Sequence, residues 1–416
     1  MSTPAFAVVG ALDNVPSASL LLPYFQVDLN NPDGVTTLLS INNASSGPAI
    51  AHVTVWTDLS VPTLAFNVFL TGYDVHTLNL RDLFTTGILP ATSHSNTTIS
   101  PRGTFSSTTN PVSGVGPGST TCNGQLPLPP LDPAQLAHIR AAHTGQGSAI
   151  FGGLCTGVDF GDNIARGYIT VDNANFCTLR TPVDAATGYF IAGGLGDANN
   201  INQLWGDFFY VDPGNNFAQG ESLVHLEADP SLGAANYTFY RRYAAGGQDQ
   251  REGLATTWAA RYLNGGAFTG GTDLIVWRDA KRTINPFSCA LVAPAPFPLS
   301  HNQIVAFDEQ ETPDIPEPPA FFPPVPNDPI IIPWEANLVQ VGGPDLPVAF
   351  NFGWLYLNLN TAVAGSQVPF EPITQNWVGV IHNADGRFSV GHGGVSFDNV
   401  TDLLKAKDCF IGFGGC

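Results

Sequence analysis

Residues 20–84 carry the pattern that decides the fold: LLLPYFQVDLNNPDGVTTLLSINNASSGPAIAHVTVWTDLSVPTLAFNVFLTGYDVHTLNLRDLF. Short apolar runs alternate here with turns built from Asn, Asp, Gly, Pro and Ser. This regular spacing is typical of antiparallel strands in a sandwich or barrel. Within residues 63–70, one face carries Leu64, Phe66, Val68 and Leu70. Because side chains of a strand point alternately to its two faces, the period of two predicts a half-buried strand.

The same alternation returns in the second half of the chain. Strand-like runs occur at 165–172, 202–212, 221–229, 237–243, 257–263, 272–279, 350–359, 376–383 and 387–397. The turns draw on 44 glycines and 34 prolines, and 416 residues are enough for two or more domains. We therefore predict an all-β protein with two β-sandwich-like domains, Pro/Gly-rich loops and one short helix.

The predicted helix lies in residues 128–145, which read LPPLDPAQLAHIRAAHTG. Asp132 suits the N-cap, and Pro133 suits the first helical position because its missing N–H needs no partner there. Leu136, Ile139 and Ala142 recur at helical spacing up to Gly145. His138 and His143 are five residues apart, so they do not form an i, i+4 metal-binding pair.

Shifts in composition divide the chain into four predicted parts. Residues 1–17 form an apolar N-terminal arm, and residues 18–100 form an immunoglobulin-like β-sandwich. Residues 101–150 hold a Ser/Thr/Gly-rich linker and the short helix, and residues 151–416 form a larger β domain. Nine prolines in segment 312–334 exclude a central strand there, so we expect an extended surface segment.

The charge balance excludes several classes of partner. Charged residues make up 12% of the chain, and the net charge is −19. Nucleic-acid binding needs basic patches that neutralise phosphates, so we expect no nucleic-acid partner. An anionic membrane surface is disfavoured for the same reason. No run of 18 apolar residues occurs, so the chain is not predicted to span a membrane.

The cysteines point to an oxidising compartment. They are Cys122, Cys155, Cys177, Cys289, Cys409 and Cys416, with no CxxC pair among them. An even number in an acidic, β-rich chain favours three disulfides, with buried free thiols as the alternative. Proximity in sequence suggests the pairs Cys122–Cys155, Cys177–Cys289 and Cys409–Cys416. The N-terminus carries no signal-peptide pattern, so we expect a mature chain that is secreted or held at the cell surface.

Four runs carry a resemblance to known sequences. They are NPDGVTTLLSINNAS (31–45), residues 51–84, ARGYITVDNANFCTLRTP (165–182) and GGTDLIVWRD (270–279). They resemble a group of uncharacterised exported bacterial proteins, and the first also resembles an immunoglobulin-like sandwich module. The resemblance implies a bacterial source and export. It implies no activity, cofactor or catalytic residue.

The densest acidic cluster contains Asp308, Glu309 and Glu311, followed by Asp314 and Glu317. Hard cations take several oxygen ligands from such loops, so we name the first three as metal-ligand candidates, with Ca²⁺ as the ion. The alternative is a solvated charge run that keeps the Pro-rich segment extended. No other cofactor is expected.

Two histidines flank the last predicted hairpin. His382 and His392 lie on either side of Ala384-Asp385-Gly386, where Gly386 supplies the positive φ of the turn. The two rings are placed to come close across the hairpin and hold a metal. However, a structural zinc ion usually takes four ligands, and no carboxylate or third histidine accompanies this pair locally.

Aromatic and acidic residues also combine in QLWGDFFY (203–210), where Trp205 precedes Asp207. With Glu221 and Glu227 on nearby predicted strands, this could form a carbohydrate site. The alternative is a sandwich core, because aromatic residues bury large areas.

The functional reading follows from what the chain contains and lacks. It has no GxSxG elbow, Walker loop, HExxH motif or EF-hand loop. We therefore predict an extracellular structural or interaction protein rather than an enzyme, with a self-assembling surface or filament subunit as the specific form. Residues 1–19 or 312–334 would then reach a neighbouring copy in a homo-oligomer or polymer. The alternative is a secreted glycan-binding protein or glycoside hydrolase.

Overall fold

The computed structural model describes residues 14–89, 130–232, 238–281, 284–290, 299, 303–314, 332–360 and 374–396. These residues form two compact units. The first unit contains the described residues of Pro16–Glu252 and Lys281–Ala295, and the second contains those of Met1–Val15, Gly253–Ala280 and Pro296–Cys416. Antiparallel strands dominate both units, which confirms the predicted all-β, sandwich-like class.

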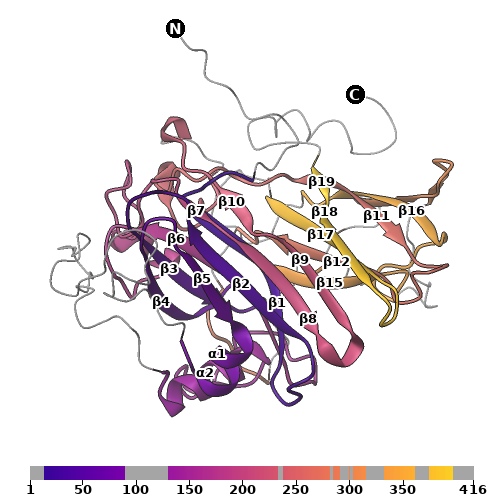
Figure 1. Cartoon of the computed structure of the whole chain (residues 1–416), viewed down its shortest axis with the longest axis horizontal. Helices are drawn as coiled ribbons and strands as arrows, with labels where there is room; N and C mark the ends of the chain where they lie inside the picture. The colour runs from indigo at the N-terminus through magenta and orange to yellow at the C-terminus, as the bar shows by residue number, and fades with distance from the viewer. Residues whose placement is uncertain are drawn as a thin grey trace, which may run out of the picture. The chain divides into compact units, whose positions relative to one another are not determined.

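Two sheets build the first unit (Figure 1). One has the order β10-β1-β6-β3-β4, and the other has the order β5-β2-β8-β9, with β7 also paired to β2. The bounds are β1 Ser19–Asp28, β2 Thr36–Asn43, β3 Ala49–Trp56, β4 Pro62–Leu70, β5 Val75–Asn79, β6 Ile164–Ala174, β7 Leu204–Trp205, β8 Asp207–Asp212, β9 Phe217–Ser222 and β10 Val224–Leu226.

Strand β6 changes the predicted domain organisation. The five runs within residues 20–84 do form β1 to β5, but β6 pairs with β1 on one side and with β3 on the other. Strand β8 likewise pairs with β2. The sandwich expected over residues 18–100 is therefore not a separate unit. Without β6, strands β1 and β3 would leave long apolar edges unpaired, which is costly in water.

The described residues of the first unit also form two α-helices, α1 Leu80–Thr86 and α2 Pro133–His143. Helix α2 begins as predicted, because the Asp132 carboxylate accepts a hydrogen bond of 2.8 Å from the backbone N–H of Gln135. Helix α1 was not predicted. Its N-cap is Asn79, whose side chain accepts from Arg81 N, and it ends at Gly87 with φ of 73°.

Short 3-10 helices complete the first unit. They are η1 Pro182–Thr187, η2 Pro213–Asn215, η3 Pro230–Leu232 and η4 Ala245–Gly247. Residues 238–243, in contrast, form turns and not the predicted strand. The reason is a buried carboxylate, because Asp249 accepts bonds from Thr238 Oγ1 and from Tyr240 N and so holds the turn.

The second unit also contains two sheets, with the orders β14-β13-β16-β11-β19 and β15-β12-β17-β18. The bounds are β11 Thr257–Leu263, β12 Gly271–Arg278, β13 Ile304–Phe307, β14 Pro313–Asp314, β15 Ala336–Val341, β16 Phe352–Asn358, β17 Asn376–Asn383, β18 Ser389–Gly393 and β19 Val395–Ser396. The turn between β17 and β18 has positive φ at Asp385 (47°) and Gly386 (72°), which confirms the predicted hairpin.

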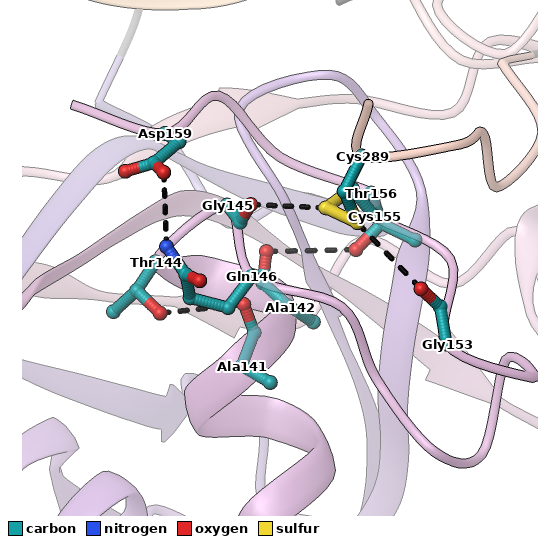
Figure 2. The surroundings of a disulfide bond; sticks show 10 residues. All are labelled: Ala141, Ala142, Thr144, Gly145, Gln146, Gly153, Cys155, Thr156, Asp159 and Cys289. Carbon is teal, nitrogen blue, oxygen red and sulfur yellow. Dashed lines mark hydrogen bonds between the residues drawn. A yellow bond between two sulfur atoms is a disulfide. The ribbon is translucent and has the colours of Figure 1, made fainter. Parts of the chain in front are cut away.

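A disulfide joins Cys155 to Cys289, with 5.2 Å between their Cα atoms (Figure 2). This bond contradicts the predicted pairs Cys122–Cys155 and Cys177–Cys289. Sequence proximity failed because the backbone of Cys155 pairs with that of Phe287, which brings a remote segment alongside. Cys177 is also disulfide-bonded, while Cys122, Cys409 and Cys416 lie outside the described residues.

Several predictions fall on parts of the chain that the structure does not describe. The N-terminal arm is described only from residue 14, and the linker only from residue 130. In the Pro-rich segment 312–334, residues 315–331 lie outside the described ranges. The roles assigned to these three segments therefore stay predictions.

Candidate functional site

The outward surface of the sheet β5-β2-β8-β9 gathers the residues of the candidate site. The inward side chains of its two central strands are buried, among them Leu39, Ile41, Phe208 and Tyr210. The alternate residues face outward, because successive side chains of a strand point to opposite sides. We call this surface the outer face, and it comprises Leu38, Ser40, Asn42, Val75, Thr77, Asn79, Trp205, Asp207, Phe209, Gly220 and Ser222.

Cross-strand pairing sets the order of these side chains. Leu38 lies opposite Phe209, and Asn42 lies opposite Trp205. Between these pairs, the Ser40 hydroxyl donates a hydrogen bond of 2.7 Å to the Asp207 carboxylate. The outer face thus places one carboxylate between two aromatic residues.

Phe209 is held in place by the glycine opposite. Its ring fills the space above Gly220, where an added Cβ would lie only 2.2 Å from a ring carbon. The side chain is nevertheless 45% exposed, and Val75 on the same face is 67% exposed. Phe209 therefore presents a positioned aromatic surface to solvent.

The polar atoms between the aromatic residues are partly satisfied. Asn42 Nδ2 donates to Ser40 Oγ at 3.0 Å. Its Oδ1 atom is buried and has no hydrogen-bond partner among the described residues. The acceptor that this face offers to a ligand rich in hydroxyl or amide groups is therefore the carboxylate of Asp207.

The other predicted carbohydrate-site acids are not brought to this face. Glu221 lies opposite Phe208 in the β8–β9 pair, so it shares the side of the buried strand residues. Its charge helps to raise the pKa of buried Tyr210, after the larger effect of burial itself. Glu227 lies beyond β10 and accepts a backbone bond from Glu252. A hydrolytic pair of Asp207 and Glu221 on one face is therefore not formed.

The three predicted metal ligands lie in the turn between β13 and β14. Asp308 Oδ1 accepts bonds of 2.8 Å from the backbone N–H groups of Thr312 and Gln310, which lower the pKa of this carboxyl. Glu309 forms a 2.5 Å ion pair with Arg261, and Glu311 has a positive φ of 64°. Within the described ranges, no three His, Cys, Asp or Glu side chains gather to hold a metal. Calcium binding here stays a prediction.

The two hairpin histidines do meet, as the sequence suggested. The Nε2 atoms of His382 and His392 are 3.2 Å apart. His382 Nδ1 lies 3.0 Å from Thr272 Oγ1, and His392 Nδ1 lies 2.9 Å from its neighbouring carbonyl oxygen, that of Gly393. Burial lowers the pKa of His382 to about 4, with smaller effects from His392 and Arg261.

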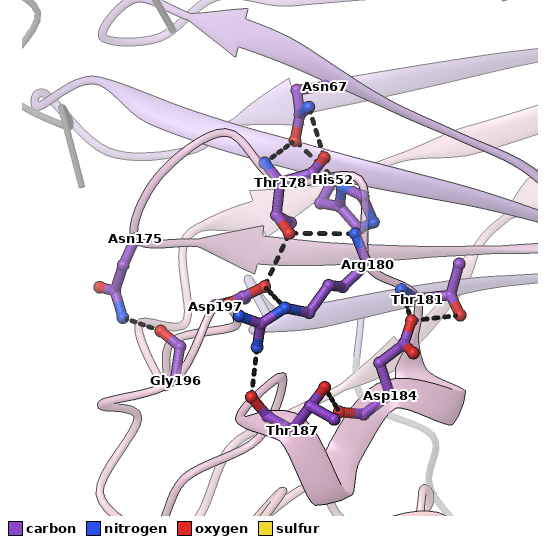
Figure 3. A network of polar contacts seen from close by, with 10 residues as sticks. All are labelled: His52, Asn67, Asn175, Thr178, Arg180, Thr181, Asp184, Thr187, Gly196 and Asp197. Carbon is purple, nitrogen blue, oxygen red and sulfur yellow. Dashed lines mark hydrogen bonds and ion pairs between the residues drawn. The ribbon is translucent and has the colours of Figure 1, made fainter. Parts of the chain in front are cut away.

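A first buried polar network ties the loop after β6 to strands β3 and β4 (Figure 3). Asn67 Oδ1 accepts a hydrogen bond of 2.9 Å from His52 Nδ1, and Asn67 Nδ2 donates to the Thr178 carbonyl. Thr178 Oγ1 donates to Asp197 at 2.6 Å, and Arg180 lies 3.7 Å from the same carboxylate. Burial lowers the pKa of His52 and raises that of Asp197. These side chains therefore fix the loop after β6 to the sheet.

A second buried network surrounds Asp172 on β6. Its carboxylate accepts hydrogen bonds from the Ser19, Tyr189 and Tyr240 hydroxyls. Arg251, which is 0% exposed, donates to Ser19 Oγ and to carbonyl oxygens of the surrounding loops. Sequence reasoning missed this network, because its members share no motif. The signal that was available is a strand residue, Asp172, that is charged within an apolar run.

Comparison of the chain with family models, with curated proteins and with solved structures found no match. Among the described residues, no helix has the length and apolar character needed to cross a membrane.

Proposed function

We propose that this chain is an extracellular structural or interaction protein that presents the outer face to a partner. The observation that carries the proposal is the composition of this face: exposed Val75 and Phe209 beside the single carboxylate of Asp207. A face that combines exposed apolar side chains with uncharged polar groups and one carboxylate is typical of a surface that another molecule covers.

The burial of charged residues elsewhere in the first unit supports a structural role for the protein. Three charged residues, Asp172, Asp249 and Arg251, are buried. Asp172 accepts a hydrogen bond from the Tyr189 hydroxyl, Asp249 accepts one from a backbone N–H, and Arg251 donates to a backbone carbonyl. Buried groups held in this way fix the positions of loops and strands. The Cys155–Cys289 disulfide supports an oxidising, extracellular location.

The first partner that we propose is another copy of the chain, in an oligomer, surface layer or filament. Sedimentation velocity over a range of concentrations tests this. We expect assembly of the wild type and a shift towards monomer in Val75→Lys. Leu195→Lys, at a loop residue that is 75% exposed in the same unit, is the matched control and should assemble normally. A wild type that stays monomeric at high concentration, without polymers in electron micrographs, overturns self-assembly.

A glycan is the second candidate partner, and the fixed ring of Phe209 on the same face as the Asp207 carboxylate favours it. Sugars combine apolar faces with many hydroxyls, so an aromatic ring flanked by hydrogen-bond acceptors suits them. Affinity electrophoresis in gels that contain polysaccharides should show retardation of the wild type, which Phe209→Ala removes. Phe160→Ala, at an aromatic residue that is 50% exposed in the same unit, is the control. Equal mobility of wild type and Phe209→Ala in every gel excludes this partner.

A further inference from the structure

We propose that His382 and His392 form a binding site for one divalent transition-metal ion, such as Zn²⁺, with water completing the coordination. The site belongs to the second unit, and it is independent of the outer face. It uses one histidine from β17 and one from β18.

The distance between the two nitrogen atoms fits this role. Zinc–imidazole bonds of 2.0–2.1 Å that meet at a tetrahedral angle place their nitrogen atoms about 3.4 Å apart. The Nε2 atoms of His382 and His392 are 3.2 Å apart before any ion is bound. An ion can therefore enter with a movement of a few tenths of an ångström.

The opposite nitrogen of each ring already has an oxygen neighbour. His392 Nδ1 lies 2.9 Å from the Gly393 carbonyl oxygen, which can only accept, so this nitrogen carries a proton. In the neutral ring the lone pair is then on Nε2, where a metal would bind. In His382, the corresponding nitrogen atom Nδ1 lies 3.0 Å from Thr272 Oγ1. Oxygen partners on the outer nitrogen are what orient metal-binding histidines in proteins.

The contact between the two Nε2 atoms also fits exchange of a proton for a metal ion. Two lone pairs that face each other at 3.2 Å repel, so without a metal one Nε2 atom carries a hydrogen and donates it to the other. When an ion binds, the Nε2 proton of His382 leaves to water or moves to Nδ1, where Thr272 Oγ1 can accept it, and both Nε2 lone pairs are then free for the metal. The strand pairing fixes the arrangement, since His382 lies opposite Val390 and His392 lies opposite Val380.

Access and charge around the pair are compatible with an ion. His392 is exposed, and glycines at 391 and 393 flank it, which leaves room for water ligands. The rings of Phe268 and Phe388 form the apolar side of the site, through edge contacts of Phe268 with His382 and Phe388. Arg261 is the nearby cation, and its charge is compensated by the 2.5 Å ion pair with Glu309.

Titration calorimetry of the untagged full chain with ZnCl₂ tests the site. We expect the wild type to bind zinc, and His392→Gln to bind it roughly tenfold or more weakly. His392 is exposed, so its replacement should leave the fold intact, which circular dichroism will verify. His76→Gln, on β5 of the first unit, is the control and should bind as the wild type does. Equal zinc affinity of His392→Gln and wild type, or no binding by the wild type, overturns the proposal.

A spectroscopic experiment provides a second readout that does not depend on affinity. Electron paramagnetic resonance of the wild type with one equivalent of Cu²⁺ should show coupling to two imidazole nitrogens. His382→Gln and His392→Gln should each reduce this to one. A wild-type spectrum without imidazole coupling, or one that is unchanged by both substitutions, contradicts the site.

Discussion

The Nε atom of Arg251 donates a hydrogen bond of 2.8 Å to the Oγ atom of Ser19, which lies 232 residues earlier in the chain. Both side chains are 0% exposed. Ser19 in turn donates to Asp172 on β6, so the first residue of β1, strand β6 and the end of the segment Pro16–Glu252 share one network. A charge this deeply buried is stable only while all its partners remain in place.

Replacing Arg251 should therefore be severe. We expect Arg251→Met to lower the free energy of unfolding by about 3–5 kcal/mol, because the Asn199 and Asp249 carbonyls lose their donor. Urea unfolding followed by tryptophan fluorescence measures the change. Arg261→Met breaks an ion pair whose side chains are 54% and 53% exposed, and it should cost less than about 1 kcal/mol. Similar losses for the two variants would contradict the assigned role of Arg251.

The disulfide should stabilise the fold by restricting the unfolded chain. Cys155 and Cys289 are 134 residues apart, and closing so long a loop is worth about 2–5 kcal/mol. We expect the double variant Cys155→Ser/Cys289→Ser to show that loss in thermal unfolding. Mass spectrometry of a non-reduced digest should find a peptide pair that links the two cysteines. A peptide that links Cys122 to Cys155 would refute the pairing.

His143 should make the fold sensitive to acid. Burial lowers the pKa of this histidine from an ordinary value of 6.5 to about 3. The folded protein therefore holds His143 neutral, with Thr63 and the Arg166 carbonyl 2.7 Å from its two ring nitrogens. The stability that this neutral ring provides is complete above pH 6.5 and is lost as the pH falls towards 3.

The variant His143→Gln separates this effect from general acid unfolding. It should be less stable than the wild type at pH 7, but its stability should fall less steeply between pH 6.5 and pH 4. The difference in slope corresponds to an effect on the order of 4 kcal/mol over the full range. Parallel pH profiles of the two proteins would show that His143 does not carry the effect.

Asp273 on β12 should make stability depend on pH in the opposite direction to His143. Burial raises the pKa of this carboxyl to about 6, because the charged form is poorly solvated there. A raised pKa in the folded state means that stability is greatest below the unfolded pKa near 4 and falls as the pH rises through 6. We therefore expect the free energy of unfolding of Asp273→Asn to be about 2–3 kcal/mol higher than that of the wild type at pH 7.5. At pH 4 the advantage should disappear, and a constant advantage at both pH values would contradict the assignment.

Calcium binding at the β13–β14 turn can be measured directly. If Asp308, Glu309 and Glu311 bind Ca²⁺, millimolar CaCl₂ should raise the melting temperature of the wild type. Glu311→Gln should reduce this shift while it leaves the turn bonds of Asp308 intact. Identical melting curves with CaCl₂ and with the chelator EDTA would remove calcium from the functional reading.

Part of the candidate site was visible in the sequence and part was not. Trp205 and Asp207 could be named, because an aromatic residue beside an acid is a local pattern. The roles of Phe209 and Gly220 could not, because the ring is held by a residue on the neighbouring strand. Which face of β8 meets solvent depends on the second sheet of the sandwich, and no short stretch of sequence specifies that.

The sequence by itself determined the local features: the all-β class, the strands of residues 20–84, the capped helix α2 and the hairpin turn at Gly386. Each depends on periodicity, caps or turn residues within a few positions of one another. The tertiary structure alone decided the place of β6 between β1 and β3, the Cys155–Cys289 bond and the 3.2 Å approach of His382 to His392. These depend on strand pairing between distant segments. Which strands pair depends on how well whole sheets bury their apolar faces. Residues that are neighbours in the chain therefore do not indicate it.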